Sequence, residues 1–259
     1  MIHRALQPHQ RMWCSREITD LCLPAGAFSS PPPSQRLPSR HLSSGFHAHL
    51  PTRRHDSRWP CGSGTLTQIA ADYGISSYFR DADGIYVNLY IPSTLRWKQG
   101  DAEITLTQKS EYPFESNVQF EMSASKPKNF SVNFRIPSWA DGASLSVNGK
   151  RVGDAIIPGK FASIQRQWKT GDRIELELPT RPRLEPINER HPNTVALMSG
   201  PLVLFAMTDA APTSTKIQFL AAKKVGPQKW QAATAAGTLD FLPFTAIADE
   251  PYTTYLNVS

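Results

Sequence analysis

The sequence predicts a mainly β protein, with jelly-roll-like β-sandwich domains, one short helix and a disordered N-terminal tail. From residue 76 onward, short runs of residues alternate between apolar and polar, as in strands that bury one face. Turn signals separate these runs at intervals of about ten residues, which is typical of a β-sandwich. The sequence has no glycine-rich phosphate loop and no alternation of strands with helices.

Residues 1–58 differ in composition from the rest of the chain. They contain three consecutive prolines, six of the seven histidines and no apolar periodicity, which predicts disorder. Most of the net charge of +6 also lies here, without a basic helix or a stacking motif beside it. We therefore expect no nucleic-acid partner. The irregular histidine spacing argues against a metal-binding tract.

The cysteines and the hydropathy limit the class of protein. Cys14, Cys22 and Cys61 are odd in number and widely spaced, which argues against a disulfide-stapled secreted module. No stretch approaches the roughly 18 apolar residues of a membrane span, so no membrane partner is expected. Few cysteines and no recognisable signal peptide favour a cytoplasmic location.

The first ordered element is a short helix at residues 65–73. Thr65 is available as its N-cap and Gly74 as its C-terminal stop. Its apolar face is formed by Leu66, Ile69, Ala70 and Tyr73. We expect no other good helix in the chain.

Strands follow this helix in close succession. Asp83 and Gly84 predict the turn of a hairpin whose second strand ends at Pro92. The predicted inward-facing residues of that strand are Ile85, Val87, Leu89 and Ile91. Alternating apolar residues predict three further strands at residues 102–109, 117–124 and 129–137.

Two turn signals organise the next part of the chain. Asn148 and Gly149 tolerate positive φ and predict a two-residue hairpin. A turn at residues 170–172 separates predicted strands at 162–168 and 173–179.

The last eighty residues show a weaker pattern. The four prolines of residues 179–193 predict a connection across the sandwich, and residues 194–207 predict two buried strands on either side of a Gly-Pro break. Residues 208–238 are expected to form a surface excursion before a final strand at 252–258.

Candidate catalytic residues are sparse. Glu111, Glu115 and Asp172 are interpreted as surface carboxylates, because nothing places them across a cleft from one another. After residue 58, His191 and Cys61 are the only residues of their types, and two such residues fall short of the four ligands of a zinc site. Cys61 could be reactive through Arg58 and the start of the helix, which would favour the thiolate.

Several motifs in order carry a family resemblance. They are CGSGT at residues 61–65, YPFE at 112–115, FRIPSWA at 134–140, VNGK at 147–150 and VALMSGPLVLF at 195–205. With these motifs, residues 59–259 resemble the C-terminal part of glycoside hydrolase family 127, the β-L-arabinofuranosidase family.

The resemblance implies a catalytic site that this chain does not complete. The family carries an N-terminal (α/α)6 barrel in which a zinc-bound cysteine is the nucleophile, and a glutamate and three cysteines hold the metal. Cys61 matches the nucleophile and metal ligand, whereas Gly62 replaces a ligand cysteine. We therefore expect that zinc is not bound and that the chain is an inactive fragment lacking the barrel.

The same resemblance predicts the domain layout. Residues 59–75 match the end of the barrel, 76–185 the middle sandwich domain and 186–259 a C-terminal β-unit. The surface that faces the barrel in relatives would be exposed here, and we expect self-association through it.

Two functions remain open from the sequence. The first is a truncated hydrolase of L-arabinofuranosides, and the alternative is a non-catalytic carbohydrate-binding or structural module. A sugar-stacking platform would use exposed aromatic residues, and the candidates are Trp97, Trp139, Trp168 and Tyr112. Burial of the same residues in the core would remove that platform.

Overall fold

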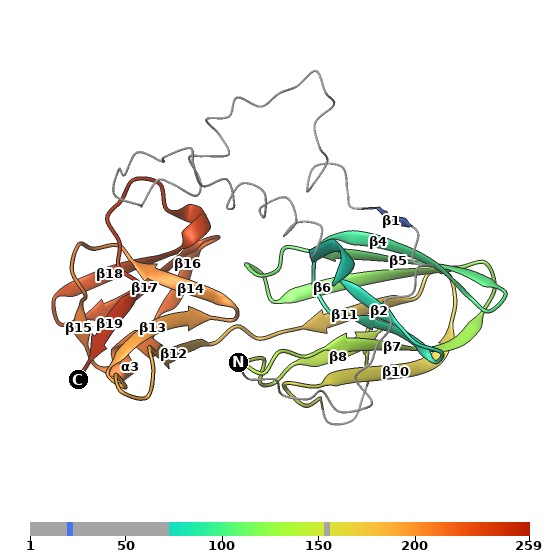
Figure 1. Ribbon diagram of the computed structural model, residues 1–259, viewed down its shortest axis with the longest axis horizontal. Coiled ribbons are helices and arrows are strands. Elements are labelled where there is room, and N and C mark those ends of the chain that lie inside the picture. Colours follow the sequence, from blue (N-terminus) through green and yellow to red (C-terminus); the bar gives the residue numbers. More distant parts are fainter. Residues whose placement is uncertain (1–19, 23–72, 153–155) are drawn as a thin grey trace, which may run out of the picture. The chain divides into compact units, whose positions relative to one another are not determined.

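A computed structural model describes residues 20–22, 73–152 and 156–259 (Figure 1). These residues fall into two compact units that divide between Pro179 and Thr180, here called the sandwich unit and the C-terminal unit. Within the described residues, no helix is both long enough and apolar enough to cross a membrane.

The sandwich unit contains two facing sheets. Its strands in chain order are β1 (Asp20–Cys22), β2 (Tyr78–Arg80), β3 (Gly84–Val87), β4 (Ser93–Gln99), β5 (Ala102–Ser110), β6 (Asn117–Ala124), β7 (Lys128–Arg135), β8 (Ser144–Val147), β9 (Lys150–Val152), β10 (Phe161–Trp168) and β11 (Arg173–Glu177). The larger sheet has the order β1-β4-β5-β6-β11-β8-β9 and the smaller β10-β7-β3-β2.

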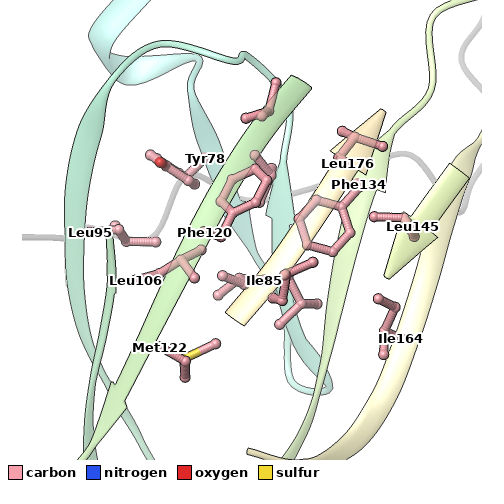
Figure 2. Close-up of a cluster of buried hydrophobic side chains, with 14 of the residues drawn as sticks. Tyr78, Ile85, Leu95, Leu106, Phe120, Met122, Phe134, Leu145, Ile164 and Leu176 are labelled. Carbon is pink, nitrogen blue, oxygen red and sulfur yellow. The ribbon is translucent and has the colours of Figure 1, made fainter. Parts of the chain in front are cut away.

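Aromatic contacts join the two sheets across the core. Phe120 on β6 meets Phe134 on β7 with ring centroids 5.0 Å apart, and Trp97 on β4 meets Phe130 on β7 at 5.7 Å. The side chains between the sheets are almost entirely removed from water, and Figure 2 shows how they interdigitate. Burial of these large apolar side chains, each worth about 1.5–3 kcal/mol, is the main stabilising term of this unit.

The smaller sheet contains a parallel pair between β3 and β7. Gly84 lies opposite Ser131 in this pairing, and a Cβ atom at Gly84 would lie 1.9 Å from the Ser131 backbone oxygen. The entry into β3 is fixed by Asp81, whose carboxylate accepts hydrogen bonds from the N–H groups of Asp83 and Gly84, both at 2.9 Å. Only glycine fits this close backbone approach.

Most sequence predictions for the sandwich unit are confirmed. Strands lie at the expected places from residue 102 to residue 177, and Asn148 and Gly149 form the hairpin turn with positive φ. The predicted strand up to Pro92 is too long, because β3 ends at Val87 and the next N–H group, that of Asn88, bonds to Ser77 instead.

Two further predictions concern the start of this unit. The helix expected at residues 65–73 is described only from Tyr73, and it continues to Ile75, past the expected stop at Gly74. Strand β4 was not predicted, although Leu95 and Trp97 alternate with charged residues. Apart from β1, the tail of residues 1–58 lies outside the described residues, so its disorder stays a prediction.

The C-terminal unit is a single curled sheet with short helices. Its elements are β12 (Pro182–Pro186), β13 (Thr194–Ser199), β14 (Leu202–Ala206), β15 (Thr213–Ser214), α3 (Lys216–Leu220), β16 (Lys223–Gly226), β17 (Lys229–Thr234), β18 (Gly237–Pro243), the 3₁₀ helix η2 (Phe244–Ala246) and β19 (Tyr255–Val258). The sheet order is β15-β19-β13-β14-β18-β17-β16, and β12 pairs with β13.

This unit departs from the sequence prediction in two segments. The proline-rich connection contains a strand, β12, because its prolines stand at the strand ends. The expected surface excursion at residues 208–238 instead contains helix α3 and strands β15, β16 and β17. Its buried residues Phe219 and Trp230 belong to the core, where Phe219 packs edge-on against Phe241 with centroids 6.4 Å apart.

Candidate functional site

The predicted nucleophile lies outside the described residues, and so does its neighbour Gly62. The role of Cys61 and its zinc therefore stay predictions. Among the residues that the structure describes, no group of three or more His, Cys, Asp and Glu side chains could hold a metal ion. His191 is exposed, and its Nδ1 lies 2.9 Å from the Asn188 side-chain oxygen.

The three candidate carboxylates differ in their burial. Glu111 and Glu115 are exposed, as expected, but the interpretation of Asp172 as a surface carboxylate is wrong because it is buried. Its carboxylate accepts hydrogen bonds from the Asn148 side-chain amide at 2.8 Å and from the Lys169 N–H at 3.0 Å. Asp172 therefore joins two turns and is structural.

The tryptophans divide into buried and half-buried residues. Trp97 and Trp168 are 5% and 0% exposed, and their indole N–H groups donate to Gln99 at 3.2 Å and to the Phe130 carbonyl at 3.0 Å. These two cannot contribute to an exposed sugar-stacking platform, and for them the alternative of burial in the core holds. Trp139 remains at the surface and is only partly buried.

Trp139 belongs to a cluster at the surface of the sandwich unit, here called the aromatic patch and made of Tyr90, Tyr112, Arg135 and Trp139. Tyr112 follows β5, whereas Arg135 ends β7 and Trp139 comes shortly after it. The Tyr112 and Trp139 rings are stacked, with planes 12° apart and centroids 6.5 Å apart. The quoted motifs YPFE and FRIPSWA thus meet, although one follows β5 of the larger sheet and the other begins at the end of β7 in the smaller sheet.

Tyr90 supports the patch from beneath. It is buried, meets Tyr112 edge-on with centroids 5.7 Å apart, and donates its hydroxyl proton to the carbonyl of Arg135. Tyr90 was not predicted as a site residue, because the expected strand to Pro92 placed it on the outer face. Arg135 was not predicted either, although it lies within the FRIPSWA motif.

The electrostatics of the patch keep its phenols protonated. Burial raises the pKa of Tyr112 to about 12, and the positive charge of Arg135 opposes the rise. Burial also raises the pKa of Tyr90, with a smaller contribution from Tyr112. At neutral pH the patch therefore presents a neutral phenol beside a guanidinium group.

A second surface feature is a hollow in the C-terminal unit. It has a volume of about 450 Å³ and is lined by Asp209, Asp249, Glu250, Pro251 and Tyr252. Its carboxylates form no metal-binding group, and the Glu250 carboxylate accepts the Ala248 N–H at 2.8 Å. The hollow therefore has no metal-binding group among the described residues, and the aromatic patch is the stronger candidate site.

Comparison with known proteins places the patch in a recognised domain. The family model described as the β-L-arabinofuranosidase, GH127 middle domain matches residues 84–180. Residues 84–180 are therefore similar to the middle domain of family 127. All four residues of the aromatic patch lie within it. No curated protein matches the chain.

Solved family 127 structures share this fold. A β-L-arabinofuranosidase from Geobacillus stearothermophilus T6 has a TM-score of 0.63 at 20% identity, covering 80% of this chain and 40% of that chain. A protein named glycoside hydrolase has a TM-score of 0.61 at 23% identity, with coverages of 92% and 43%. A family 127 β-arabinofuranosidase has a TM-score of 0.59 at 21% identity, covering 77% of this chain and 38% of that chain.

These coverages define the extent of the likeness. The chain spans about 40% of the length of the solved structures that it matches. The predicted relationship to the C-terminal part of family 127, and the mainly β fold, are confirmed.

Proposed function

We propose that this chain is the β-sandwich portion of a β-L-arabinofuranosidase-like glycoside hydrolase and does not hydrolyse glycosides by itself. The observation that carries this proposal is the family 127 middle domain at residues 84–180. The two-unit β fold, which spans about 40% of the solved family 127 structures, supports it. A carbohydrate is the substrate class of an intact relative.

The expected lack of turnover follows from the chemistry around Cys61. A thiol needs a metal or a positive environment to become a nucleophilic thiolate near neutral pH. Gly62 replaces a ligand residue of the family motif, and the described residues provide no metal-binding group. Cys61 and Gly62 therefore do not supply the donor set of a zinc site.

The test is an assay of the purified full chain with 4-nitrophenyl β-L-arabinofuranoside, with and without added zinc. We expect no release of nitrophenol above the blank, and bound zinc below one-tenth of the protein concentration by elemental analysis. Turnover that disappears in Cys61→Ser, but not in a Cys22→Ser control, would show that the chain is a complete enzyme and overturn the proposal.

A second test concerns the gene. Transcript sequencing upstream of codon 59 should be read for an in-frame segment that encodes a glutamate, a cysteine and a second cysteine beside Cys61. Such a segment would assign the sandwich portion to a zinc-dependent hydrolase. Its absence would assign the function to the sandwich alone.

A further inference from the structure

We propose that the aromatic patch of the sandwich unit binds a neutral saccharide without cleaving it. The site is made of Tyr112, Arg135 and Trp139, with Tyr90 beneath. This inference does not depend on hydrolysis, and the proposed function determines only which saccharide is tested first.

The first argument is that the patch holds hydrogen-bond donors that lack acceptors. Within the described part of the chain, no hydrogen bond is made by the Tyr112 hydroxyl or the Trp139 indole N–H, and the Arg135 guanidinium has no ion pair. Arg135 is exposed, whereas Tyr112 and Trp139 are partly buried, and donors of this kind are satisfied by a ligand or by water. The hydroxyl and ring oxygens of a saccharide are acceptors spaced closely enough to meet several of them.

The second argument is the shape of the stacked pair. Stacked rings in contact are separated by about 3.5–4.0 Å along their normal. The measured centroid distance of 6.5 Å at an interplanar angle of 12° therefore means that the Tyr112 and Trp139 rings are offset. Offset rings leave part of each ring face uncovered by the other ring, which gives a stepped aromatic surface. The C–H face of a sugar ring packs on such a surface, because its slightly positive hydrogens meet the negative π face.

The third argument is that the patch is already ordered. The Tyr90 hydroxyl holds the Arg135 carbonyl, and its ring supports Tyr112 edge-on. Tyr112 follows strand β5 and Arg135 ends strand β7, so ligand binding would cost little conformational entropy for ordering them. This arrangement differs from surface aromatics that must be fixed on binding.

The charges favour a neutral ligand over an anionic one. Arg135 contributes one positive charge, and the exposed Glu111 precedes Tyr112 in the same loop with one negative charge. The Glu111 carboxylate can accept hydrogen bonds from the hydroxyl groups of a saccharide, and the Arg135 guanidinium can donate hydrogen bonds to them. We expect the ligand to be a short stretch of neutral polysaccharide.

The experiment is isothermal titration of the full chain with three probes, namely α-1,5-linked arabinotriose, xylotriose and cellotriose. We expect at least one probe to bind. Arg135→Gln should weaken that binding about tenfold and Tyr112→Phe about fivefold, the loss of one charged and one neutral hydrogen bond. The control Arg151→Gln, an exposed arginine on β9 of the same unit, should stay within about twofold.

A third variant separates ligand contact from folding. Trp139→Phe keeps an aromatic ring in the stack but removes the indole N–H and the fused five-membered ring, so we expect weaker binding with only a small change in thermal unfolding. The proposal is overturned if no probe binds more tightly than about 10 mM. It is equally overturned if Arg135→Gln and Tyr112→Phe bind like the unsubstituted chain. Hydrolysis plays no part in this readout, so failure of the binding proposal and failure of the proposed function are separate results.

Discussion

Gly84→Ala should disrupt the sandwich unit more than any surface substitution. The added Cβ would lie 1.9 Å from the Ser131 oxygen and 2.7 Å from its carbonyl carbon, and both atoms belong to the backbone of β7. The first distance is about 1.5 Å short of ordinary van der Waals contact, so β3 must move away from β7. No rotamer change relieves a clash with backbone.

The expected cost combines two losses. Separating β3 from β7 breaks backbone hydrogen bonds worth about 1 kcal/mol each. It also displaces Ile85 and Val87, which are 1% and 0% exposed, from the core. We expect a loss of at least about 3 kcal/mol in the free energy of unfolding of the sandwich unit.

The assay is urea unfolding read by hydrogen exchange and mass spectrometry. Peptides from β3 and β7 should lose protection at a urea concentration lower by at least about 1 M, given typical urea slopes of 1–3 kcal/mol per M. Peptides from β13 and β14 in the C-terminal unit serve as the internal reference. Gly226→Ala, where the new Cβ meets only the Lys229 Cβ at 3.6 Å, is the matched control and should change little. A Gly84→Ala midpoint within about 0.3 M of the original would refute the reasoning.

Three other predictions follow from described contacts. Asn148→Ala should cost about 2–3 kcal/mol by calorimetry, because it removes one of the hydrogen bonds to the buried Asp172 and strains a φ of 52°. Asn148→Gly should relieve only the backbone strain. Burial raises the pKa of Tyr78 from 10.0 to about 12. Above pH 10 the unfolded chain loses this proton while the folded chain keeps it, so stability should fall from pH 10 to about 12 by roughly 2 kcal/mol. Urea unfolding across this range should show a smaller fall in Tyr78→Phe. Finally, the chain should self-associate, as measured by sedimentation velocity. Ile75→Glu should weaken this self-association, because Ile75 is 59% exposed. Equal association of the variant and the unsubstituted chain would contradict the prediction.

The sequence predicted the fold best where a period of two coincided with a strong turn signal. Phe120 and Phe134 were placed on buried faces because their neighbours alternate, and the Asn148 turn followed from its tolerance of positive φ. The prediction failed where the backbone, and not the hydrophobic pattern, decides the outcome. The alternation after Val87 continues, yet the N–H groups of the next residues bond to Ser77.

The candidate site was only partly accessible from the sequence. Composition cannot distinguish a tryptophan that closes a core from one that faces water, so Trp97 and Trp139 looked equivalent. The pairing of Tyr112 with Trp139 depends on two sheets lying face to face, which no local pattern encodes. Arg135 becomes a site candidate only once Tyr90 is seen to hold its carbonyl.

The short strand β2 has a practical consequence for work on this domain. The match to the family 127 middle domain begins at Gly84, whereas β2 precedes it and covers the outer edge of β3. An expression clone cut at residue 84 would leave the backbone groups of β3 unpaired at a sheet edge, where another chain could add a strand. Clones that begin before Tyr78 keep this edge capped, and the two boundaries should differ in the yield of monomeric protein.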